Sequence, residues 1–522
     1  MTRKTILLAA SFLLLLTAAA GCGAGVQQEE LSSGVSQVIE QPEFERTSWS
    51  IQVVDLETGE VLEQMNHRKM LDPASTTKLF SVASALEVLG PDHRFRTPVY
   101  LQGPLDASGQ LDGNLVLVAS GDMAMGGRVT PDGEIEYTAM DHTEANVLGN
   151  AILTPTDPLA GLNELAGQVA ASGVKSVDGD VLVDARLFPT EKPLGDPEEH
   201  VTSPIVINDN LVDITVTPTS SGSPAEITWR PQSAAFTVLP SVTTVDSDGI
   251  TGIEVASDGP GIIAVSGTIA QDGGDVVRTW ETGDPESFAR TLFIEALERA
   301  GITVNAPAVA PNPVDLLPPH NSYQGMEQAA ELVSPPFSEY AKLILKVSLN
   351  YGANTLLPLM AVHEGGADFY EGLGVMRSFL VTAGVDVNSL VINDGAGAAG
   401  SDYIPAEPVT QLLRYMSTSD NYRVFREGLP VMGVDGTLAG ILPESRIAGK
   451  VHAKTGTHAT LDMMNQRLVL TARALGGYMS ASSGRELALH VSAVMIVPDE
   501  ETDMMDLARR HATVLEAIYD RH

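Results

Sequence analysis

Alternating apolar and polar residues predict a β-hairpin near the start of the chain. Residues 50–55 alternate toward a strand, residues 57–60 supply a turn, and Val61 begins the return strand. Apolar residues then recur at helical spacing over residues 79–89, and Gly90 with the proline after it ends that pattern. The sequence therefore predicts two strands followed by a helix.

The character of the chain changes between residues 97 and 325. Strand-like runs separated by turns rich in Gly, Asp and Pro occur at 115–119, 181–183, 214–216 and 262–265. Helix-like runs occur at 159–172 and 288–300, and the prolines of residues 307–319 indicate a return linker. This pattern predicts a large β-rich insertion of one or two subdomains.

From about residue 326 the helical pattern dominates again. Helix-like runs occur at 339–347, 354–362 and 409–416, strand-like runs at 468–472, 475–479 and 488–496, and a final helix at 504–518. The hairpin at one end and the strands and helix at the other indicate one α+β domain that is split by the insertion. We expect residues 43–96 and 326–522 to form this domain and residues 97–325 to be inserted.

A short apolar run at the N-terminus predicts an export signal. Arg3 and Lys4 precede residues 6–16, which are apolar but too few to span a bilayer as a mature helix. Small residues and then Cys22 follow, which resembles a bacterial lipoprotein signal (residues 1–22) whose cysteine becomes lipidated; an ordinary cleaved signal is the alternative. Residues 23–42 predict a tether. We expect an exported protein of the cell envelope, anchored to a membrane only through its N-terminal lipid.

Composition disfavours several other kinds of function. The chain has 522 residues, with 31 Lys and Arg against 67 Asp and Glu, so its formal net charge is −36. A nucleic-acid partner is disfavoured because phosphate binding needs a basic face. The 11 histidines show no metal-ligand spacing, and no dinucleotide-binding glycine loop occurs. We therefore predict neither a metal site nor a cofactor.

Three short motifs occur in order along the chain. They are Ser-x-x-Lys at 75–78, Ser-x-Asn at 348–350 and Lys-Thr-Gly at 454–456. The first two are weak alone, but the trio is typical of class A β-lactamases and penicillin-binding proteins. Residues three apart lie on one face of a helix, so Lys78 can reach the hydroxyl of Ser75, which needs a base to become a nucleophile. Burial and a second cation, for which Lys454 is the candidate, would lower the pKa of such a lysine.

The patterns of the first two motifs each occur a second time in the chain. Residues 172–175 also read Ser-x-x-Lys, but they contain a glycine and lie at the end of a predicted helix, so we interpret them as a surface turn. Residues 419–421 read Ser-Asp-Asn directly after another predicted helix, where such residues commonly form turns and helix caps. We therefore assign the second motif to residues 348–350.

Beyond the motifs, the chain resembles the class C low-molecular-mass penicillin-binding proteins, the S13 family of D-alanyl-D-alanine carboxypeptidases. The likeness covers roughly residues 45 to 520, and the long gap between the first and second motifs fits that family. The similar blocks are residues 73–79, 121–122, 206–210, 394–397, 429–438 and 453–457. The resemblance implies an α+β penicillin-binding fold like that of the serine β-lactamases, with an antiparallel sheet flanked by helices and a helical subdomain.

The resemblance also implies roles for individual residues. Ser75 would be the acylated nucleophile and Lys78 its base, Ser348 would relay a proton, and Asn350 would hold the substrate backbone. The second motif departs from the family pattern, because Leu349 stands where Asp is usual. The roles belong to the residues on either side, so we expect this departure to be tolerated.

The third motif would bind the substrate on the same family pattern. Lys454 and Thr455 would hold the terminal carboxylate, Gly456 would let the substrate pack along the strand, and the backbone N–H groups of Ser75 and Thr457 would form the oxyanion hole. Ala396 stands where the family has Ser in an Asp-Gly-Ser-Gly block, so local hydrogen bonding there should differ.

Three kinds of function remain after these arguments. The first is a serine D-Ala-D-Ala carboxypeptidase or endopeptidase acting on peptidoglycan stem peptides and acylated by β-lactams. The second is a β-lactamase-like hydrolase with fast deacylation, and the third is a non-catalytic peptidoglycan-binding lipoprotein. The intact motifs favour the peptidase over the non-catalytic lipoprotein. No deacylating glutamate can be assigned from the sequence, which disfavours the β-lactamase-like hydrolase.

Overall fold

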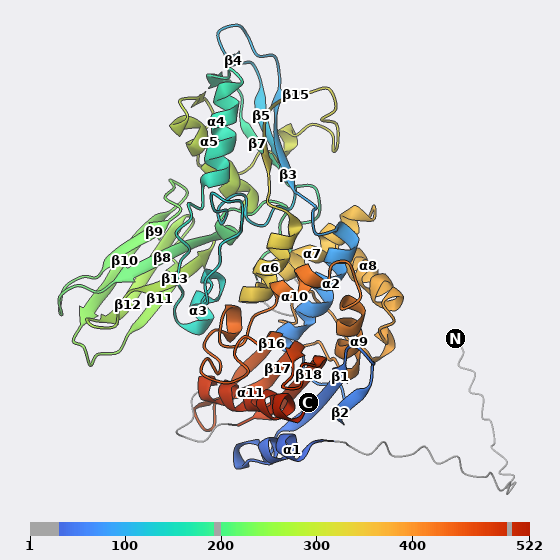
Figure 1. Cartoon of the computed structure of the whole chain (residues 1–522). Helices are drawn as coiled ribbons and strands as arrows, with labels where there is room; N and C mark the ends of the chain where they lie inside the picture. The colour runs from blue at the N-terminus through green and yellow to red at the C-terminus, as the bar shows by residue number, and fades with distance from the viewer. Residues whose placement is uncertain (1–30, 193–199, 498–503) are drawn as a thin grey trace, which may run out of the picture.

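The computed structural model describes residues 31–192, 200–497 and 504–522. Figure 1 shows a helical and sheet-containing body from which two further lobes extend. The predicted signal peptide and Cys22 lie outside the described residues. Within the described part of the chain, no helix is both long and apolar enough to cross a membrane.

A five-stranded antiparallel sheet in the order β16-β17-β18-β1-β2 forms the centre of the split domain. Its strands are β1 (Ser48–Asp55), β2 (Val61–Met65), β16 (Val451–Asp462), β17 (Arg467–Ser480) and β18 (Glu486–Ile496). The first strand of the chain pairs with the last, so Ser48 lies opposite Val494. The predicted hairpin is confirmed as β1 and β2, and the two runs predicted at 468–479 form one strand.

Helices cover both faces of this sheet, which is why seven of the eight residues of β1 are buried. The terminal helix α11 (Met504–Arg521) packs its apolar residues against Trp49, Ile51 and Val53 on one face. Helices α2 and α9 cover the other face, where Leu79 and Val409 share a core with the sheet residue Tyr478. The side chains of Ser50 and Gln52 are buried although they are polar, so β1 keeps the alternating sequence from which the strand was predicted.

The helical part of the domain surrounds α2. Its helices are α2 (Lys78–Leu89), α6 (Phe337–Val347), α7 (Asn350–His363), α8 (Phe369–Thr382), α9 (Ala406–Met416) and α10 (Tyr422–Gly428). Helix α2 ends at Gly90, whose φ of 84° suits a glycine cap. Helices α8 and α10 were not predicted. Gly372 and Gly374 interrupt the apolar pattern of α8, and α10 has only seven residues.

The first lobe of the insertion is a four-stranded sheet in the order β15-β3-β5-β7 that packs against two helices (Figure 1). Its elements are β3 (Arg96–Gln102), β5 (Asn114–Val118), β7 (Val181–Asp184), β15 (Glu327–Val333), α4 (Ala160–Ala171) and α5 (Pro285–Arg299). A small sheet at its edge contains β4 (Gln110–Leu111), β6 (Ser176–Val177) and β14 (Thr303–Val304). Asp284 caps α5 by accepting a hydrogen bond from the Ser287 amide.

The second lobe consists of two three-stranded sheets that enclose a separate small core. The sheets have the orders β13-β8-β9 and β10-β12-β11. Their strands are β8 (Leu211–Thr217), β9 (Glu226–Arg230), β10 (Thr237–Val245), β11 (Gly252–Ser257), β12 (Ile262–Ala270) and β13 (Val276–Glu281). A loop carrying η3 (His142–Glu144) and α3 (Ala145–Leu148) lies beside β13, where the Asn146 amide donates to the Thr279 carbonyl at 3.0 Å.

Two segments differ from the sequence-based prediction. Residues 23–42 were interpreted as a tether, but residues 33–39 form α1 (Ser33–Ile39), which packs against α11 and buries Val35; Phe44 nearby is also buried. Leu31, Val35, Val38 and Ile39 recur at helical spacing and pack against this core, but the run is only two turns long and lies among polar residues, so it was not recognised as a helix. Strand β15 follows residue 326 yet pairs with β3 in the first lobe, so the insertion extends to about residue 333. The end of the insertion is determined by the pairing of β15 with β3, which lies far away in the sequence. The pattern of apolar residues within one segment cannot predict such a pairing.

Candidate active site

The first motif lies where a 3-10 turn runs into helix α2. Ser75 is in η2 (Ala74–Thr77) and is partly exposed, whereas Lys78 is the first residue of α2 and is fully buried. The Lys78 Nζ donates to Ser75 Oγ at 2.8 Å. The sequence placed Ser75 in the first turn of the helix; the structure places it in the tighter turn just before. The predicted contact between the two residues is present.

Lys78 connects the first motif to two other segments. Its Nζ donates to Asn350 Oδ1 at 2.6 Å and to the Ala396 carbonyl at 2.9 Å. Asn350 is the first residue of α7, so the second motif reaches the nucleophile through this lysine. A buried ammonium with three oxygen partners is held in one position, which orients it toward the serine.

Ser348 faces the third motif. It ends α6 in the left-handed region with φ 67°, and this turn separates α6 from α7. The Lys454 Nζ on β16 donates to Ser348 Oγ at 2.9 Å. Burial, together with the positive charges of Lys78 and Arg473, holds the pKa of Lys454 well below its usual value, and Glu144 opposes this only in part. The structure therefore places a buried amino group, whose charged form is disfavoured, against the hydroxyl of Ser348.

Strand β16 forms one wall of the site. The Oγ1 atoms of Thr455 and Thr437 lie 2.8 Å apart. A Cβ on Gly456 would lie 2.3 Å from the Pro73 carbonyl oxygen, so the strand can approach the nucleophile turn only because this residue is glycine. The resemblance assigned Gly456 to substrate packing; the contact seen here is with the turn that carries Ser75. Thr457 is exposed, and its Oγ1 accepts a hydrogen bond from Arg473.

The loop after residue 393 packs on the same turn. The Asp394 carboxylate accepts hydrogen bonds from the backbone N–H groups of residues 396, 397, 398 and 399. A Cβ on Gly397 would lie 2.0 Å from the Ala74 carbonyl oxygen, and its φ of 72° also favours glycine. The Ala396 side chain is buried, and its carbonyl, not its side chain, contacts Lys78.

Comparison with known proteins decides the family. The model of the D-Ala-D-Ala carboxypeptidase 3 (S13) family matches residues 31–512. The chain belongs to this family. A D-alanyl-D-alanine carboxypeptidase from an Actinomadura species is 28% identical over an alignment of 496 residues, which covers 90% of this chain and 81% of that protein. The resemblance stated from the sequence is thereby confirmed.

Solved structures agree with the S13 assignment. Penicillin binding protein 4 (dacB) from Haemophilus influenzae has a TM-score of 0.70 at 20% identity, covering 93% of this chain and 99% of that one. The same protein complexed with a β-lactam has a TM-score of 0.67. These likenesses confirm the predicted α+β penicillin-binding fold.

The rival motifs lie elsewhere in the S13 chain. Ser172 follows α4, and its hydroxyl donates to the Val169 carbonyl at 2.8 Å. Asn421 precedes α10, and its amide donates to the Leu86 carbonyl at 3.2 Å and to Glu87 at 3.1 Å at the end of α2. The bond of Ser172 lies within its own turn, whereas Asn421 connects the turn before α10 to the end of α2. Both segments are turns, as the sequence predicted.

Glu144 was not found by sequence reasoning. It ends η3 in the insertion and is partly exposed. Burial raises the pKa of Glu144, and the positive charges of Lys78 and Lys454 oppose that rise, so this carboxyl interacts electrostatically with both lysines. The insertion thus contributes a residue to the active-site region of this S13 protein. A lone glutamate in an irregular loop more than 60 residues from the first motif carries no sequence signal.

Proposed function

We propose that the chain is a serine D-Ala-D-Ala carboxypeptidase or endopeptidase of peptidoglycan stem peptides, with Ser75 as its nucleophile. The observation that carries this proposal is the buried Lys78, whose Nζ lies 2.8 Å from Ser75 Oγ and 2.6 Å from Asn350 Oδ1. Serine needs a base within hydrogen-bond reach to act as a nucleophile, and Lys78 is in that position. Membership of the S13 family supports the same reaction.

Acylation would proceed in two steps. Lys78 must be in its neutral amine form to act as the base. As Ser75 Oγ bonds to the carbonyl carbon of the penultimate D-alanine, the hydroxyl proton passes to that amine. The bond from that carbon to the nitrogen of the leaving residue then breaks, and the nitrogen takes a proton through Ser348, which Lys454 contacts at 2.9 Å. The backbone N–H groups of Ser75 and Thr457 would stabilise the oxyanion. Water then attacks the ester carbon and loses a proton through Ser348 to Lys454, while Lys78 returns its proton to Ser75 Oγ as the ester bond breaks.

Substrate binding would change the protonation of Lys454. Its pKa is lowered mainly by burial and by the charge of Lys78. A terminal carboxylate held by Lys454 and Thr455 would add a negative charge beside the ammonium and raise that pKa. The carboxylate would therefore bind together with a proton, and that proton would be available for the leaving nitrogen.

Product analysis tests the proposed reaction. Purified stem peptides that end in D-Ala-D-Ala should lose one D-alanine, identified by mass, and cross-linked dimers should be cut if endopeptidase activity is present. Ser75→Ala should yield neither product. Release of D-alanine by a folded Ser75→Ala protein would overturn the assignment.

We also propose that the chain is exported and anchored to a membrane of the cell envelope through lipid on Cys22. The basic start, the apolar run of residues 6–16 and the small residues before Cys22 support this. Cys22→Ser should release the protein from the membrane fraction. Recovery of the unmodified protein in soluble form, beginning at another residue, would contradict the lipoprotein proposal.

A further inference from the structure

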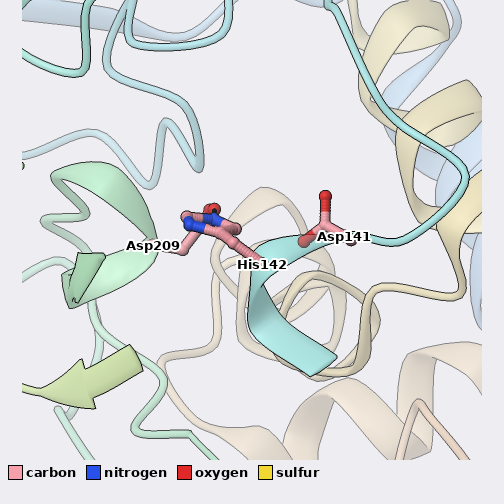
Figure 2. Close-up of side chains that lie close together, drawn as sticks. All are labelled: Asp141, His142 and Asp209. Atoms are coloured by element: carbon pink, nitrogen blue, oxygen red, sulfur yellow. Dashed lines mark hydrogen bonds and ion pairs between the residues drawn. The ribbon is translucent and has the colours of Figure 1, made fainter. Parts of the chain in front are cut away.

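A buried cluster of charged side chains lies where the insertion meets helix α7. Three of its members, Asp141, His142 and Asp209, appear in Figure 2. The whole cluster, called the charge cluster below, consists of Arg128, Asp141, His142, Asp209, Asp213 and Arg230. Asp141 and His142 belong to the loop that carries η3, and Asp213 and Arg230 belong to β8 and β9 of the second lobe.

The members of the charge cluster hold one another through short contacts. Arg128 donates to both oxygens of Asp141, at 2.7 and 3.1 Å, and its Nε donates to Asp209 at 3.2 Å. The His142 ring lies between two carboxylates, with Nδ1 2.6 Å from Asp213 and Nε2 in contact with Asp209. Arg230 Nε donates to Asp213 at 2.8 Å. The cluster therefore connects the η3 loop to the second lobe.

The positive and negative charges of the charge cluster balance one another, so its members can stabilise the fold without a bound ion. Burial alone would lower the pKa of His142, but the charges of Asp213 and Asp209 outweigh it and raise this pKa to about 10. Three cations then face three carboxylates. Asp141, His142 and Asp209 offer ligand atoms within 4.8 Å of one another. A metal ion there would have to displace the Arg128 contacts and the proton of His142, so these residues do not fit a metal site.

One contact leads from the charge cluster to the active site. The Tyr351 hydroxyl lies 2.6 Å from Asp209 Oδ1 and 2.7 Å from the Met123 carbonyl oxygen, and it can donate its single proton to either. Tyr351 is buried in the first turn of α7. Asn350 comes directly before it, and Asn350 Oδ1 accepts from Lys78 Nζ at 2.6 Å. The Tyr351 hydroxyl thus fixes the start of the helix that presents Asn350.

We infer that Asp209 and Tyr351 are positioning residues, which couple the docked insertion to Asn350 and through it to Lys78. Asp209 is held by Arg128 and His142, so the anchor for Tyr351 belongs to the insertion. The inference rests on the proposed role of Asn350. It assigns a catalytic purpose to the insertion that is separate from substrate contact, because none of these side chains needs to touch the substrate.

Tyr351→Phe tests the coupling, because it removes one hydroxyl and keeps the ring. We expect the acylation rate constant with labelled penicillin to fall about 2- to 10-fold, the effect of losing one hydrogen bond. Tyr340→Phe is the matched control. Tyr340 is equally buried, and its hydroxyl donates to Asp122 of the insertion at 2.5 Å, but it lies in α6, ten positions before Asn350, and not in the helix that presents Asn350. We expect Tyr340→Phe to lower the unfolding temperature comparably and to leave acylation unchanged.

A double-mutant cycle separates positioning from general loss of stability. If Tyr351 acts through Asn350, Tyr351→Phe should slow acylation no further in an Asn350→Ala background. Asp209→Asn, which weakens the same contact from the other side, should show the same non-additivity. Additive effects, or an unchanged rate in folded Tyr351→Phe, would overturn the inference while leaving the proposed function intact. Normal acylation by folded Asn350→Ala would overturn the inference together with the role of Asn350 on which it rests, and would leave Ser75 as the proposed nucleophile.

Discussion

Two buried lysines control the motif serines at the residue scale. Lys78 Nζ contacts Ser75 Oγ, and Lys454 Nζ contacts Ser348 Oγ. Removing an ammonium group from water disfavours its charged form, and a second cation nearby adds to this effect. Both reasons apply to Lys454, whose pKa is held well below its usual value by burial and by Lys78. Burial as well as the motif therefore supports proton exchange at this pair.

The two Ser-x-Asn motifs can be distinguished by one pair of variants. Asn350→Ala removes an oxygen that accepts from Lys78 and leaves a buried donor with one partner fewer. Such a loss costs about 1–3 kcal/mol, so acylation by penicillin should slow roughly 5- to 150-fold. Asn421→Ala removes hydrogen bonds to Leu86 and Glu87, so it should lower stability slightly and leave acylation nearly unchanged. The opposite pattern, in folded proteins, would mean that the second motif is misplaced.

Gly456 offers a test of how closely β16 must approach the nucleophile. In Gly456→Ala the new Cβ would lie 2.3 Å from the Pro73 carbonyl oxygen and 3.3 Å from the Thr76 nitrogen, so the turn carrying Ser75 must move. Displacement of a catalytic group by a fraction of an ångström to an ångström should lower the acylation rate about tenfold or more. Gly440→Ala is the control, because its Cβ would meet nothing nearer than Met505 Cε at 3.9 Å. Equal rates for both variants would contradict the close approach.

At the scale of elements, the site forms where a turn, a loop and a strand meet. The η2 turn is held from one side by β16 at Gly456 and from the other by the loop at Gly397. The loop also supplies Asp402, whose Oδ2 accepts from Thr77 Oγ1 at 3.0 Å. Thr77 lies between Ser75 and Lys78, so this carboxyl borders the catalytic turn.

Asp402 predicts a pH dependence of stability. Burial and the charge of Asp394 raise the pKa of Asp402 to about 7, above the value of about 3.9 in an unfolded chain. Because the folded state binds this proton more tightly, the contribution to stability is full below about pH 4 and is lost as the pH rises through about 7. Asp402→Asn should remove this loss, so its unfolding temperature relative to the wild type should rise between pH 5 and pH 8. A constant difference between the two proteins would contradict the raised pKa.

The sequence predicted helices and strands correctly where the pattern within a single segment is enough to identify the element. The helix of residues 79–89 and the terminal helix were visible because apolar residues repeat along one face. The motifs were recognised because residue identity and order carry their signal. Strand β15 was misassigned because its partner β3 lies more than 200 residues earlier. Helix α1 was missed because its stability comes from packing on α11 and its own pattern is weak.

At the scale of the whole molecule, the insertion is part of the active-site architecture. Its η3 loop supplies Glu144, which interacts electrostatically with Lys78 and Lys454, and its charge cluster reaches Tyr351 beside Asn350. None of these contacts could be predicted, because each joins residues that are far apart in the chain and that match no motif. The candidate catalytic residues could be named from the sequence, whereas the residues that we propose position them could be named only from the fold.

Adduct mapping is the measurement that tests the central claim most directly. The intact protein is incubated with labelled penicillin, digested, and analysed by mass spectrometry of its peptides. The account predicts one long-lived adduct on Ser75, which Ser75→Ala abolishes and Ser172→Ala leaves unchanged. An adduct that turns over rapidly would indicate a β-lactamase-like hydrolase. No adduct, or an adduct on Ser172 or Ser419, would contradict the assignment of Ser75 as the nucleophile.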